Sequence, residues 1–406
     1  MKIGYLRLNS DIKLSLDTTN SGQGIEHRRA FLNALISQGH DVTICSNLSA
    51  SERPLLRMSG FSGTSWLAKL HYDMKTPLQA FDLILLEAGS SNPRFSRDVD
   101  PKLIDTSGEV GKPWVSKGKD LAVSILQYNI RRLLNYHGKI VLWHHIYIQT
   151  SMFPFKQNLK PSKVPIEQLS DINWRKVIDG VDFFKDREWT VVHHCLNEDA
   201  FKSLRSSRFG YSYNEIPNLK WRYVHLPKSK LDPYYPVNPT PKYDSLFIGS
   251  RQTNAASDPE YDRQPSVKKF YDTPLYKGVV LGHGYDKFQY AQPLETPTSS
   301  ILVALSFWNN SYTHTFTESK AANTVGSMTG RTFLSLDSGA TLLLDKSISG
   351  ISKLGLSEYE VSSADEVKSH VDKLHSMSPE RRDEVRKAQL ATFPDWTDTS
   401  WVEVFA

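Results

Sequence analysis

The chain has 406 residues, a length that fits two domains of ordinary size, each able to bury its own hydrophobic core. Apolar residues make up 39% and charged residues 23% of the chain, without a low-complexity tract, which excludes a disordered or fibrous protein. The formal net charge of +5 is mild, so it is compatible with an anionic partner without requiring one.

The N-terminal residues read as a first strand rather than as a signal peptide, because Arg7 interrupts their apolar run. No run approaches the ~18 consecutive apolar residues of a membrane-spanning helix, so we expect no membrane association. The two cysteines, Cys45 and Cys195, each lie in an apolar strand-like run. This placement predicts core thiols of a reducing compartment rather than a disulfide or a zinc site.

Through the first half of the chain, short apolar runs alternate with longer helical patterns, which is typical of βαβ units and a parallel sheet. The predicted strands are Ile3–Leu8, Val42–Cys45, Leu83–Glu87, Ile140–His144 and Thr190–Leu196. The predicted helices are Ile25–Gln38 with Gly39 as its C-terminal signal, about Leu121–Tyr136, and a short helix after Asn197 as N-cap.

A proline-rich stretch then predicts a linker at 227–243, and a second alternation of the same kind follows it. Its predicted strands are Ser245–Ile248, Gly278–Leu281, Ile301–Ser306 and Thr341–Leu344. Its predicted helices are Ser266–Tyr271, Thr329–Asp337, Ala364–His375 and Pro379–Ala391. We therefore predict an α/β protein with doubly wound domains at 1–226 and 244–391, a tail at 392–406, and a ligand cleft between the carboxyl edges of the two sheets.

The first βα connection contains Gly22, Gln23, Gly24 and Glu26 at the start of a predicted helix. Glycines at this position let backbone N–H groups approach an anion or a sugar hydroxyl, helped by the helix dipole. The connection lacks the third glycine of a dinucleotide fingerprint and the Lys-Ser/Thr of a P-loop, which weighs against NAD and ATP. A plain tight turn is the alternative interpretation of the same residues.

Two pairs of adjacent histidines end predicted strands. His144 and His145 follow a very apolar strand, where an imidazole is placed to take a proton as a general base. Because side chains alternate along a strand, only one of the two faces the cleft, and a core histidine bonded to the backbone is the alternative. For His193 and His194 a structural role is favoured. Adjacent histidines are poorly spaced as metal ligands, so we predict no metal site.

The second half carries the residues that a diphosphate requires. Ser250 and Arg251 follow the strand that ends at Ile248, and a hydroxyl beside a bidentate guanidinium suits phosphate oxygens. Arg263 follows nearby. Arg331 opens a predicted helix, where its charge and the helix dipole together favour a departing pyrophosphate. Solvated arginines are the alternative interpretation.

In this order the motifs resemble the T-even phage DNA glucosyltransferases, most closely the β-glucosyltransferases. The resemblance rests on five segments, which are Lys139–Phe155, Phe247–Arg251, Val279–His283, Arg331–Asp345 and Trp396–Phe405. It implies the GT-B architecture, in which two Rossmann-like domains face each other across a cleft. It also implies that the tail at 392–406 is a helix that packs back on the N-terminal domain.

The resemblance implies a UDP-sugar in the second domain and a flipped 5-hydroxymethylcytosine in the first. The implied donor-site residues are Ser250, Arg251, Arg263, Gly282, His283 and Arg331. His145 stands where the β-enzymes have a catalytic aspartate, which implies that it is the base, with His144 next in line. The loop of Gly22 to Glu26 lies on the acceptor side. With arginines at the pyrophosphate, Mg²⁺ or Mn²⁺ is compatible with catalysis but not required.

Two departures from the family bear on the donor. Leu334 stands where the family has the carboxylate that binds the hydroxyls of the donor sugar. Asp337, one helical turn further on, is the candidate replacement, and a pentose such as arabinose is the alternative to glucose. An insertion at Gln252–Asp262 also lengthens the phosphate loop.

We therefore predict a phage enzyme that acts as a monomer in the cytoplasm of the bacterial host. It moves a sugar from a UDP-sugar to the hydroxymethyl group of a 5-hydroxymethyl-pyrimidine, with hydroxymethylcytosine favoured, in double-stranded DNA. Scattered basic residues, Arg132 among them, contact DNA phosphates if they share a face. Two alternatives stay open: a GT-B enzyme with a small-molecule, glycan or protein acceptor, and a non-catalytic DNA-binding protein with a degenerate transferase fold, which Leu334 motivates.

Overall fold

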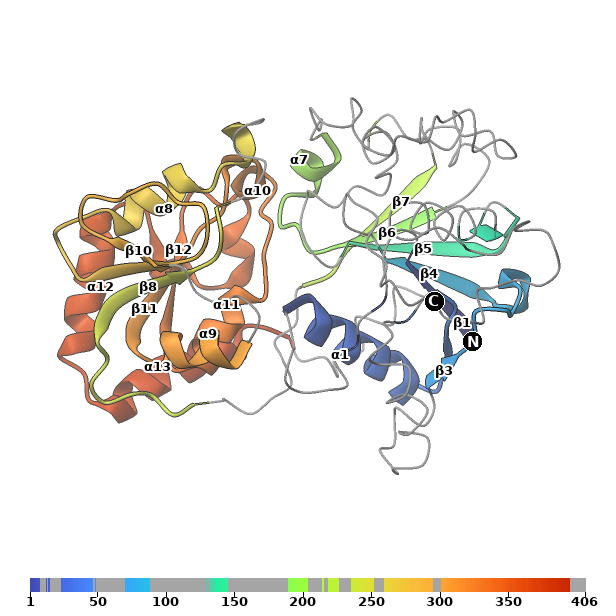
Figure 1. Cartoon of the computed structure of the whole chain (residues 1–406), viewed down its shortest axis with the longest axis horizontal. Helices are drawn as coiled ribbons and strands as arrows, with labels where there is room; N and C mark the ends of the chain where they lie inside the picture. The colour runs from blue at the N-terminus through green and yellow to red at the C-terminus, as the bar shows by residue number, and fades with distance from the viewer. Residues whose placement is uncertain are drawn as a thin grey trace, which may run out of the picture.

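The computed structural model describes residues 1–7, 12, 14, 23–46, 48, 70–87, 129, 132–133, 135–144, 189–203, 214, 218–225, 235–251, 259–294 and 301–394. These residues form two α/β units that lie side by side, each built on a parallel sheet (Figure 1). The sheet of the first unit spans residues 2–223 and that of the second spans 243–361. The tail from 395 onward and residues 227–234 of the expected linker lie outside the described residues, so the domain boundaries stay predictions.

The first sheet has the strand order β3-β2-β1-β4-β5-β6-β7, and every neighbouring pair is parallel. Its strands are β1 (Lys2–Arg7), β2 (Asp41–Ile44), β3 (Leu70–Tyr72), β4 (Leu83–Glu87), β5 (Lys139–His144), β6 (Trp189–His193) and β7 (Leu219–Tyr223). The chain reverses its direction of progress between β1 and β4. Open α/β sheets bind their ligands outside the carboxyl ends of the strands at such a switch point.

The described helices of the first unit are α1 (Gln23–Ser37) and α7 (Glu198–Ser203), with the short turn η3 (Leu78–Ala80) before β4. The apolar stripe of α1 is buried, and Phe31 stacks on Trp143 of β5 with ring centroids 4.3 Å apart. Gly39 ends α1 with φ of +83°, and the amide of His40 donates to the carbonyl of Leu35 at 3.1 Å, as in a Schellman cap. The expected C-terminal signal is therefore confirmed.

The second sheet has the order β10-β9-β8-β11-β12-β13 and is also parallel throughout. Its strands are β8 (Tyr243–Ile248), β9 (Gly278–Leu281), β10 (Gln292–Leu294), β11 (Ser311–Phe316), β12 (Thr341–Asp345) and β13 (Glu360–Val361). The switch point of this sheet lies between β8 and β11. Both sheets therefore have the doubly wound order that the alternating pattern predicted.

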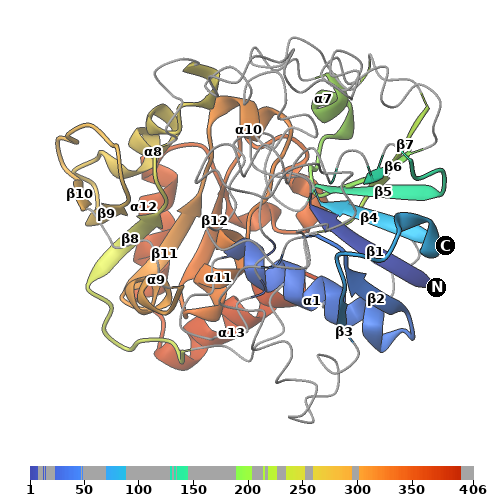
Figure 2. The same ribbon diagram turned by 45° about the vertical axis from the view of Figure 1, so that its right-hand side comes forward.

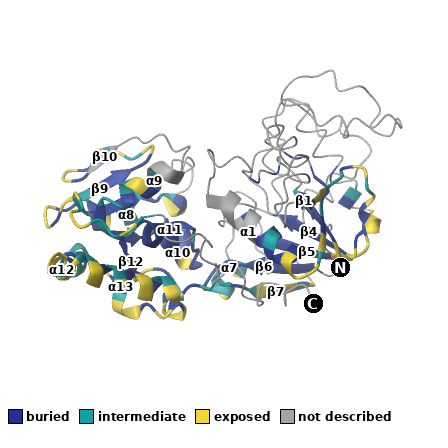
Figure 3. Cartoon of the chain, turned by 90° about the horizontal axis from the view of Figure 1, so that it is seen from below, coloured by how far each residue is buried: buried dark blue, intermediate teal, exposed yellow. Residues whose placement is uncertain are grey.

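Helices cover both faces of the second sheet. The helical segments are η7 (Pro259–Tyr261), α8 (Gln264–Tyr271), α9 (Ile301–Trp308), α10 (Lys320–Thr324), α11 (Arg331–Asp337), η8 (Ile351–Leu354), η9 (Ser357–Tyr359), α12 (Ala364–His375) and α13 (Pro379–Ala391). Helices α9, α11 and α13 pack on one face, and α8 and α12 pack on the other. In Figure 3 the strands are buried, while α12 and α13 show exposed residues on their outer sides.

One predicted element is wrong. Ile301–Ser306 was expected as a strand, but the segment Ile301–Trp308 is helix α9. A short, continuous apolar run fits a buried strand and a buried helix equally well, and periodicity does not separate them. The true central strand is β11, whose alternation of Ser, Thr and His does not read as apolar although the strand is almost wholly buried.

The two predicted core thiols are confirmed, since Cys45 and Cys195 are both free and buried. Burial raises the pKa of the Cys45 thiol to about 11, so it stays protonated at neutral pH. Among the described residues, none of the helices has the length and hydropathy to cross a bilayer.

The carboxyl edges of the two sheets meet where the chain leaves β6. Cys195 forms an antiparallel bridge with Ser327, and the amide of Leu196 donates to the carbonyl of Gly326 at 2.9 Å. The side chain of Leu196 is 1% exposed and belongs to the hydrophobic core of the second unit. Helices α7 and α10 consequently lie close to each other in both views (Figures 1 and 2).

Candidate functional site

The switch point of the second sheet brings together the loops after β8 and β9. The amide of Gly249 donates to the carbonyl of Leu281 at 2.9 Å, and the amide of Arg251 donates to the carbonyl of His283 at 2.9 Å. Two glycines permit this close approach. A Cβ on Gly249 would overlap Arg331 Nη1, and a Cβ on Gly282 would overlap the carbonyl oxygen of Gly249. Most of the predicted donor-site residues therefore share one small region.

A buried carboxylate that the sequence did not point to lies beneath these loops. Glu318 follows β11 and is fully buried. Its Oε2 accepts from Arg263 Nε at 2.7 Å, and its Oε1 is paired with Arg331 Nη2. Glu318 is thus shared by two of the predicted arginines, each only 6% exposed. The only signal in the sequence was a lone acidic residue after a strand that was itself missed.

The same two arginines also bind backbone carbonyls at the end of β8 and in the loop that follows it. Arg331 Nη1 donates to the carbonyl of Ile248 at 3.1 Å, and Arg263 Nη1 donates to the carbonyl of Ser250. With these oxygens turned inward, Ser250 is exposed at the surface of the loop. Within the described part of the chain, its amide N–H and its hydroxyl have no hydrogen-bond partner. The loop thus presents two donors to solvent beside buried guanidinium groups, an arrangement that suits an anion.

Arg251 is engaged by two carboxylates. Its Nε and Nη2 donate to the two oxygens of Asp262 at 2.9 and 2.7 Å, and its Nη1 donates to Asp286 at 2.9 Å. The hydrogen bonds that Arg251 donates to Asp262 raise the pKa of Arg251, so it is always charged. Asp262 also accepts from the amide of Gln264 at 2.9 Å at the start of α8. Arg251 therefore ties together the two ends of the predicted insertion.

The electrostatics of this region differ from what the sequence suggested. The three predicted arginines read as uncompensated positive charge, but the structure pairs all of them with carboxylates: Arg251 with Asp262 and Asp286, and Arg263 and Arg331 together with Glu318. Buried guanidinium groups without partners would be strongly unfavourable, which accounts for this matching. An anion bound here would contact the backbone and hydroxyl donors of Ser250 directly. The buried arginines hold the backbone that carries these donors.

Neither Leu334 nor Asp337, the candidate replacement for the family's carboxylate, lies in this region. Leu334 is 1% exposed in the hydrophobic core. Asp337 is the last residue of α11 and is fully buried, and its backbone carbonyl accepts from the amide of Tyr235 at 3.3 Å. At a rise of 1.5 Å per residue it lies about 9 Å along the helix from Arg331. Because α11 runs against the strands, Asp337 is at the amino edge of the sheet, away from Ser250.

The predicted residues of the first unit are described only in part. Strand β5 ends at His144, which pairs in register with His193 of β6, and His145 lies outside the described residues. Gly22 also lies outside them. Helix α1 begins at Gln23 and includes Gly24 and Glu26 in its first turn, so these residues do open a helix.

A second buried cluster lies at the switch point of the first sheet. Glu87 ends β4, and its two oxygens accept from Arg28 Nε at 2.7 Å and from Arg28 Nη2 at 2.6 Å. The hydroxyl of Tyr5 donates to the same carboxylate. Burial, and then the charge of Glu87, raise the pKa of Tyr5, so the phenol keeps its proton. This cluster fixes the first turns of α1 on the sheet.

The structural role favoured for the second histidine pair is confirmed. His193 Nδ1 accepts from the amide of Cys195 at 3.2 Å, and its Nε2 bonds Glu198 at 3.0 Å. His194 Nδ1 bonds the carbonyl of Val224 at 2.8 Å, and its Nε2 accepts from Trp143 Nε1 at 3.2 Å. Burial lowers the pKa of His193, so it is neutral near pH 7. Both rings are held by fixed partners.

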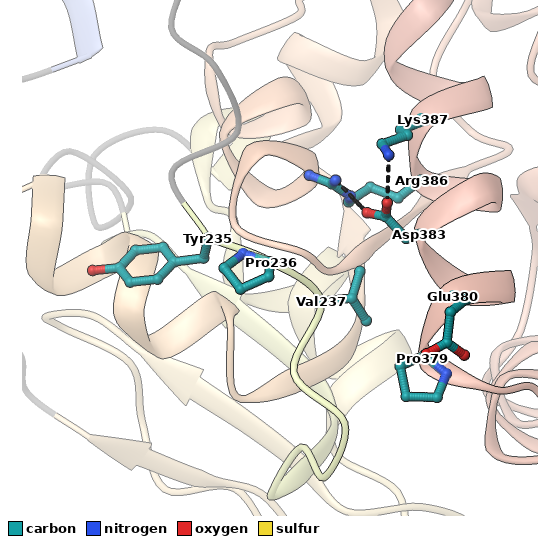
Figure 4. A pocket seen from close by; sticks show the side chains of 8 residues that line it. All are labelled: Tyr235, Pro236, Val237, Pro379, Glu380, Asp383, Arg386 and Lys387. Atoms are coloured by element: carbon teal, nitrogen blue, oxygen red, sulfur yellow. Dashed lines mark hydrogen bonds and ion pairs between the residues drawn. The ribbon is translucent and has the colours of Figure 1, made fainter.

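Two further features lie apart from the predicted site. Arg132 donates to the carbonyls of Cys45 at 2.6 Å and Thr76 at 3.0 Å, so its guanidinium links two backbone segments. A groove lies between the chain at 235–237 and helix α13 (Figure 4). In it Asp383 pairs with Arg386 and with Lys387 at 2.7 Å. None of the predicted site residues lines this groove.

Comparisons with known proteins agree with this architecture. No protein-family model matches the sequence, and no curated protein sequence matches it. Among solved structures, T4 phage BGT in complex with its UDP-glucose substrate is 14% identical with a TM-score of 0.58. The alignment covers 100% of this chain and 98% of that one.

Two further solved structures give the same result. The DNA modifying enzyme β-glucosyltransferase is 12% identical with a TM-score of 0.57, and both chains are covered completely. An α-glucosyltransferase in complex with UDP is 11% identical with a TM-score of 0.50, covering 100% of this chain and 98% of that one. At such identities the likeness establishes the fold. The chain therefore has the GT-B fold, and its expected resemblance to the phage DNA glucosyltransferases is confirmed at the level of structure.

Proposed function

We propose that this protein is a glycosyltransferase that moves a sugar from a UDP-sugar onto DNA. The observation that carries the proposal is the loop after β8, where Ser250 is an exposed residue whose amide and hydroxyl have no hydrogen-bond partner among the described residues, beside two buried arginines at the switch point. Support also comes from the chain-wide structural likeness to a phage enzyme in complex with its UDP-glucose substrate and to a DNA modifying enzyme.

In this proposal the second unit binds the UDP-sugar as co-substrate. Ser250 donates to the pyrophosphate, while Arg251, Arg263 and Arg331 stabilise the charge that develops on departing UDP. Gly282 and His283 form the neighbouring wall, since their loop is hydrogen-bonded to the loop of Ser250. Mg²⁺ or Mn²⁺ is compatible with this arrangement and is not required by it.

The first unit binds double-stranded DNA that contains a 5-hydroxymethyl-pyrimidine, with hydroxymethylcytosine favoured. The modified base must leave the stack before its hydroxymethyl group reaches a sugar donor. His145 is the proposed base, with His144 as the next candidate, and the start of α1 from Gly22 to Glu26 lies on the acceptor side. The protein is proposed to act as a monomer in the cytoplasm of a phage-infected bacterium.

The proposed reaction is a single exchange at the anomeric carbon of the sugar. His145 takes the proton of the hydroxymethyl group, and the oxygen forms a bond to the anomeric carbon. The bond between that carbon and the phosphate oxygen breaks, and UDP leaves with the electron pair. Because Leu334 is in the core and Asp337 is at the opposite edge, α11 offers no carboxylate to the sugar hydroxyls. Glucose and a pentose such as arabinose are therefore both tested as donors.

The deciding experiment incubates the protein with hydroxymethylcytosine or hydroxymethyluracil DNA and a panel of UDP-sugars, followed by digestion to nucleosides and mass analysis. We expect a mass increment on hydroxymethylcytosine that identifies the sugar. His145→Ala is the matched control, which should bind UDP as wild type does and transfer no sugar. Unchanged nucleosides on both DNAs with every donor would refute the proposed function.

A further inference from the structure

Glu318 is the one carboxylate that both buried arginines of the candidate site share. It contacts Arg263 through Nε at 2.7 Å and through Nη2 at 2.5 Å, and it contacts Arg331 through Nη2. Its side chain is fully buried, so no competing water weakens these bonds. The carboxylate therefore fixes how the two guanidinium planes are oriented.

The orientation of those planes determines the shape of the loop after β8. Arg263 bonds Glu318 through Nε and Nη2 and the carbonyl of Ser250 through Nη1. Arg331 bonds Glu318 through Nη2 and the carbonyl of Ile248, at the end of β8, through Nη1. The two held carbonyls flank the peptide bond between Gly249 and Ser250, so they fix the backbone on both sides of Ser250. The position of Ser250, an exposed residue, follows from that constraint.

The backbone of Glu318 is itself held by hydrogen bonds to the turn that follows it. Its backbone amide donates to Asn323 Oδ1 at 3.1 Å, and the carbonyl of Asn323 accepts from the amides of Gly326 at 3.0 Å and Ser349 at 2.8 Å. Gly326 in turn accepts from Leu196 of the first unit. The carboxylate is thus built into the turn on which the two units dock, which leaves it little freedom to move when a ligand arrives.

We propose that Glu318 is a positioning residue of the donor site: it orients Arg263 and Arg331 so that the loop after β8 presents Ser250 to the diphosphate of a nucleotide. This inference rests on the proposed function, because it assigns the diphosphate to the same site. Glu318 contacts neither the sugar nor the reacting atoms. It acts on diphosphate binding through the two arginines and through Ser250.

The test measures UDP and inorganic pyrophosphate affinity by isothermal titration calorimetry on the full-length protein. Glu318→Gln keeps the shape of the side chain but removes the charge that orients the arginines, so we expect about a tenfold or greater loss of UDP affinity. Glu318→Asp retains the charge on a shorter side chain, so it should recover part of the lost UDP affinity. Glu87→Gln is the matched control, since it neutralises a buried, arginine-paired carboxylate at the other switch point and should leave UDP affinity within twofold.

A double-mutant cycle separates positioning from general destabilisation. Ser250→Ala should weaken UDP binding in the wild-type background and should have little further effect beside Glu318→Gln, because the loop has already lost its shape. If Glu318→Gln does not fold, the same cycle is run with Glu318→Asp. Folded Glu318 variants that bind UDP within twofold of wild type, or a full Ser250→Ala effect in both backgrounds, would overturn the inference.

The outcome for wild type keeps this inference separate from the proposed function. Wild-type protein that binds UDP through Glu318 and Ser250 but modifies no DNA supports the positioning role and refutes the transferase. Wild-type protein without affinity for UDP or pyrophosphate overturns both.

Discussion

The two switch points of this molecule each contain a buried carboxylate, but the two clusters serve different ends. In the first unit, the described bonds of Glu87 include those to Arg28 of α1 and to Tyr5 of β1. In the second unit, Glu318 bonds two arginines whose remaining nitrogens reach the carbonyls of an adjacent loop. The first cluster fixes helix α1 on the sheet. The second cluster fixes the loop after β8, where the amide and hydroxyl of Ser250 have no hydrogen-bond partner among the described residues.

This difference shows that a buried ion pair is not by itself a sign of a binding site. Both clusters satisfy the same requirement, since a carboxylate or guanidinium removed from water must be paired. Among the described residues, the arginines of the second cluster also donate to the carbonyls of Ile248 and Ser250, so a change of charge there should alter ligand binding as well as stability.

The largest expected effect is on stability in the first unit. Glu87→Ala leaves Arg28 buried without its carboxylate, which should lower the free energy of unfolding by about 3–5 kcal/mol. Urea denaturation followed by circular dichroism measures this change. Glu260→Ala is the control, because Glu260 pairs with Lys320 at 2.8 Å on the surface and its removal should change little. A Glu87→Ala protein as stable as wild type would show that the first cluster does not hold α1.

Next in size is the loss of UDP affinity in Arg331→Lys. An ammonium cannot reproduce the separate bonds of Arg331 to Glu318, Ile248 and Thr329, so we expect a loss of about 1.5–3 kcal/mol in binding free energy. Calorimetric titration with UDP measures it. Arg382→Lys is the control, since Arg382 is equally buried but bonds the carbonyl of Pro239 far from the loop. Equal UDP affinity in both variants would contradict the assignment of the second cluster to the site.

The two units should also differ in acid sensitivity. Burial lowers the pKa of His314, on β11, to about 3, and its Nδ1 is hydrogen-bonded to the carbonyl of Leu246 at 2.9 Å. The unfolded chain binds this proton below about pH 6.5, so the folded state loses up to about 1.4 kcal/mol per pH unit as the pH falls from there toward 3. Burial also lowers the pKa of His193, but the carboxylate of Glu198 opposes that shift.

Urea midpoints measured between pH 7 and pH 5 test this prediction. His314→Asn should flatten the decline, because asparagine can still donate to Leu246 and does not titrate. An unchanged slope in His314→Asn would place the acid-sensitive group elsewhere. Since β11 leads directly to Glu318, loss of this strand on acidification should also release UDP.

The smallest expected effect comes from a pair of glycines. Gly39 ends α1 in a left-handed conformation with no atom within 4 Å of an added Cβ, so Gly39→Ala should cost about 1 kcal/mol of stability and leave UDP binding unchanged. Gly282→Ala places a Cβ against the backbone of Gly249 and should weaken UDP binding by displacing the loop. Thermal melts and UDP titrations of both variants give the comparison. Weaker UDP binding in Gly39→Ala would contradict the assignment of UDP binding to the second unit alone.

Much of the fold was predictable because its signals are local. Helices α12 and α13 have the predicted bounds, and Asn197 caps α7 as predicted, with its Oδ1 3.1 Å from the amide of Ala200. The prediction was wrong for α9 because its residues are continuously apolar, so the sequence shows neither the helical nor the strand periodicity. Strand β11 was missed because hydroxyl and imidazole side chains read as polar even where neighbouring strands bury them.

The candidate site was predictable only where its residues are adjacent in sequence. Gly249, Ser250 and Arg251 follow a recognisable strand, so their position at the sheet edge could be anticipated. The partnership of Glu318 with Arg263 spans 55 residues and depends on the pairing of β8 with β11, which no local pattern encodes. Asp337 was misplaced for a related reason, because one helical turn along α11 leads away from the carboxyl edge.

Amide hydrogen exchange with and without UDP tests most directly whether the loop after β8 is the donor site. We expect UDP to slow exchange in peptides that cover Gly249–Arg251 and Gly282–Gly284, and we expect Glu318→Gln to abolish that protection while peptides of the first switch point stay unchanged. Protection by UDP that is absent from both loops, or confined to the groove beside α13, would contradict the assignment.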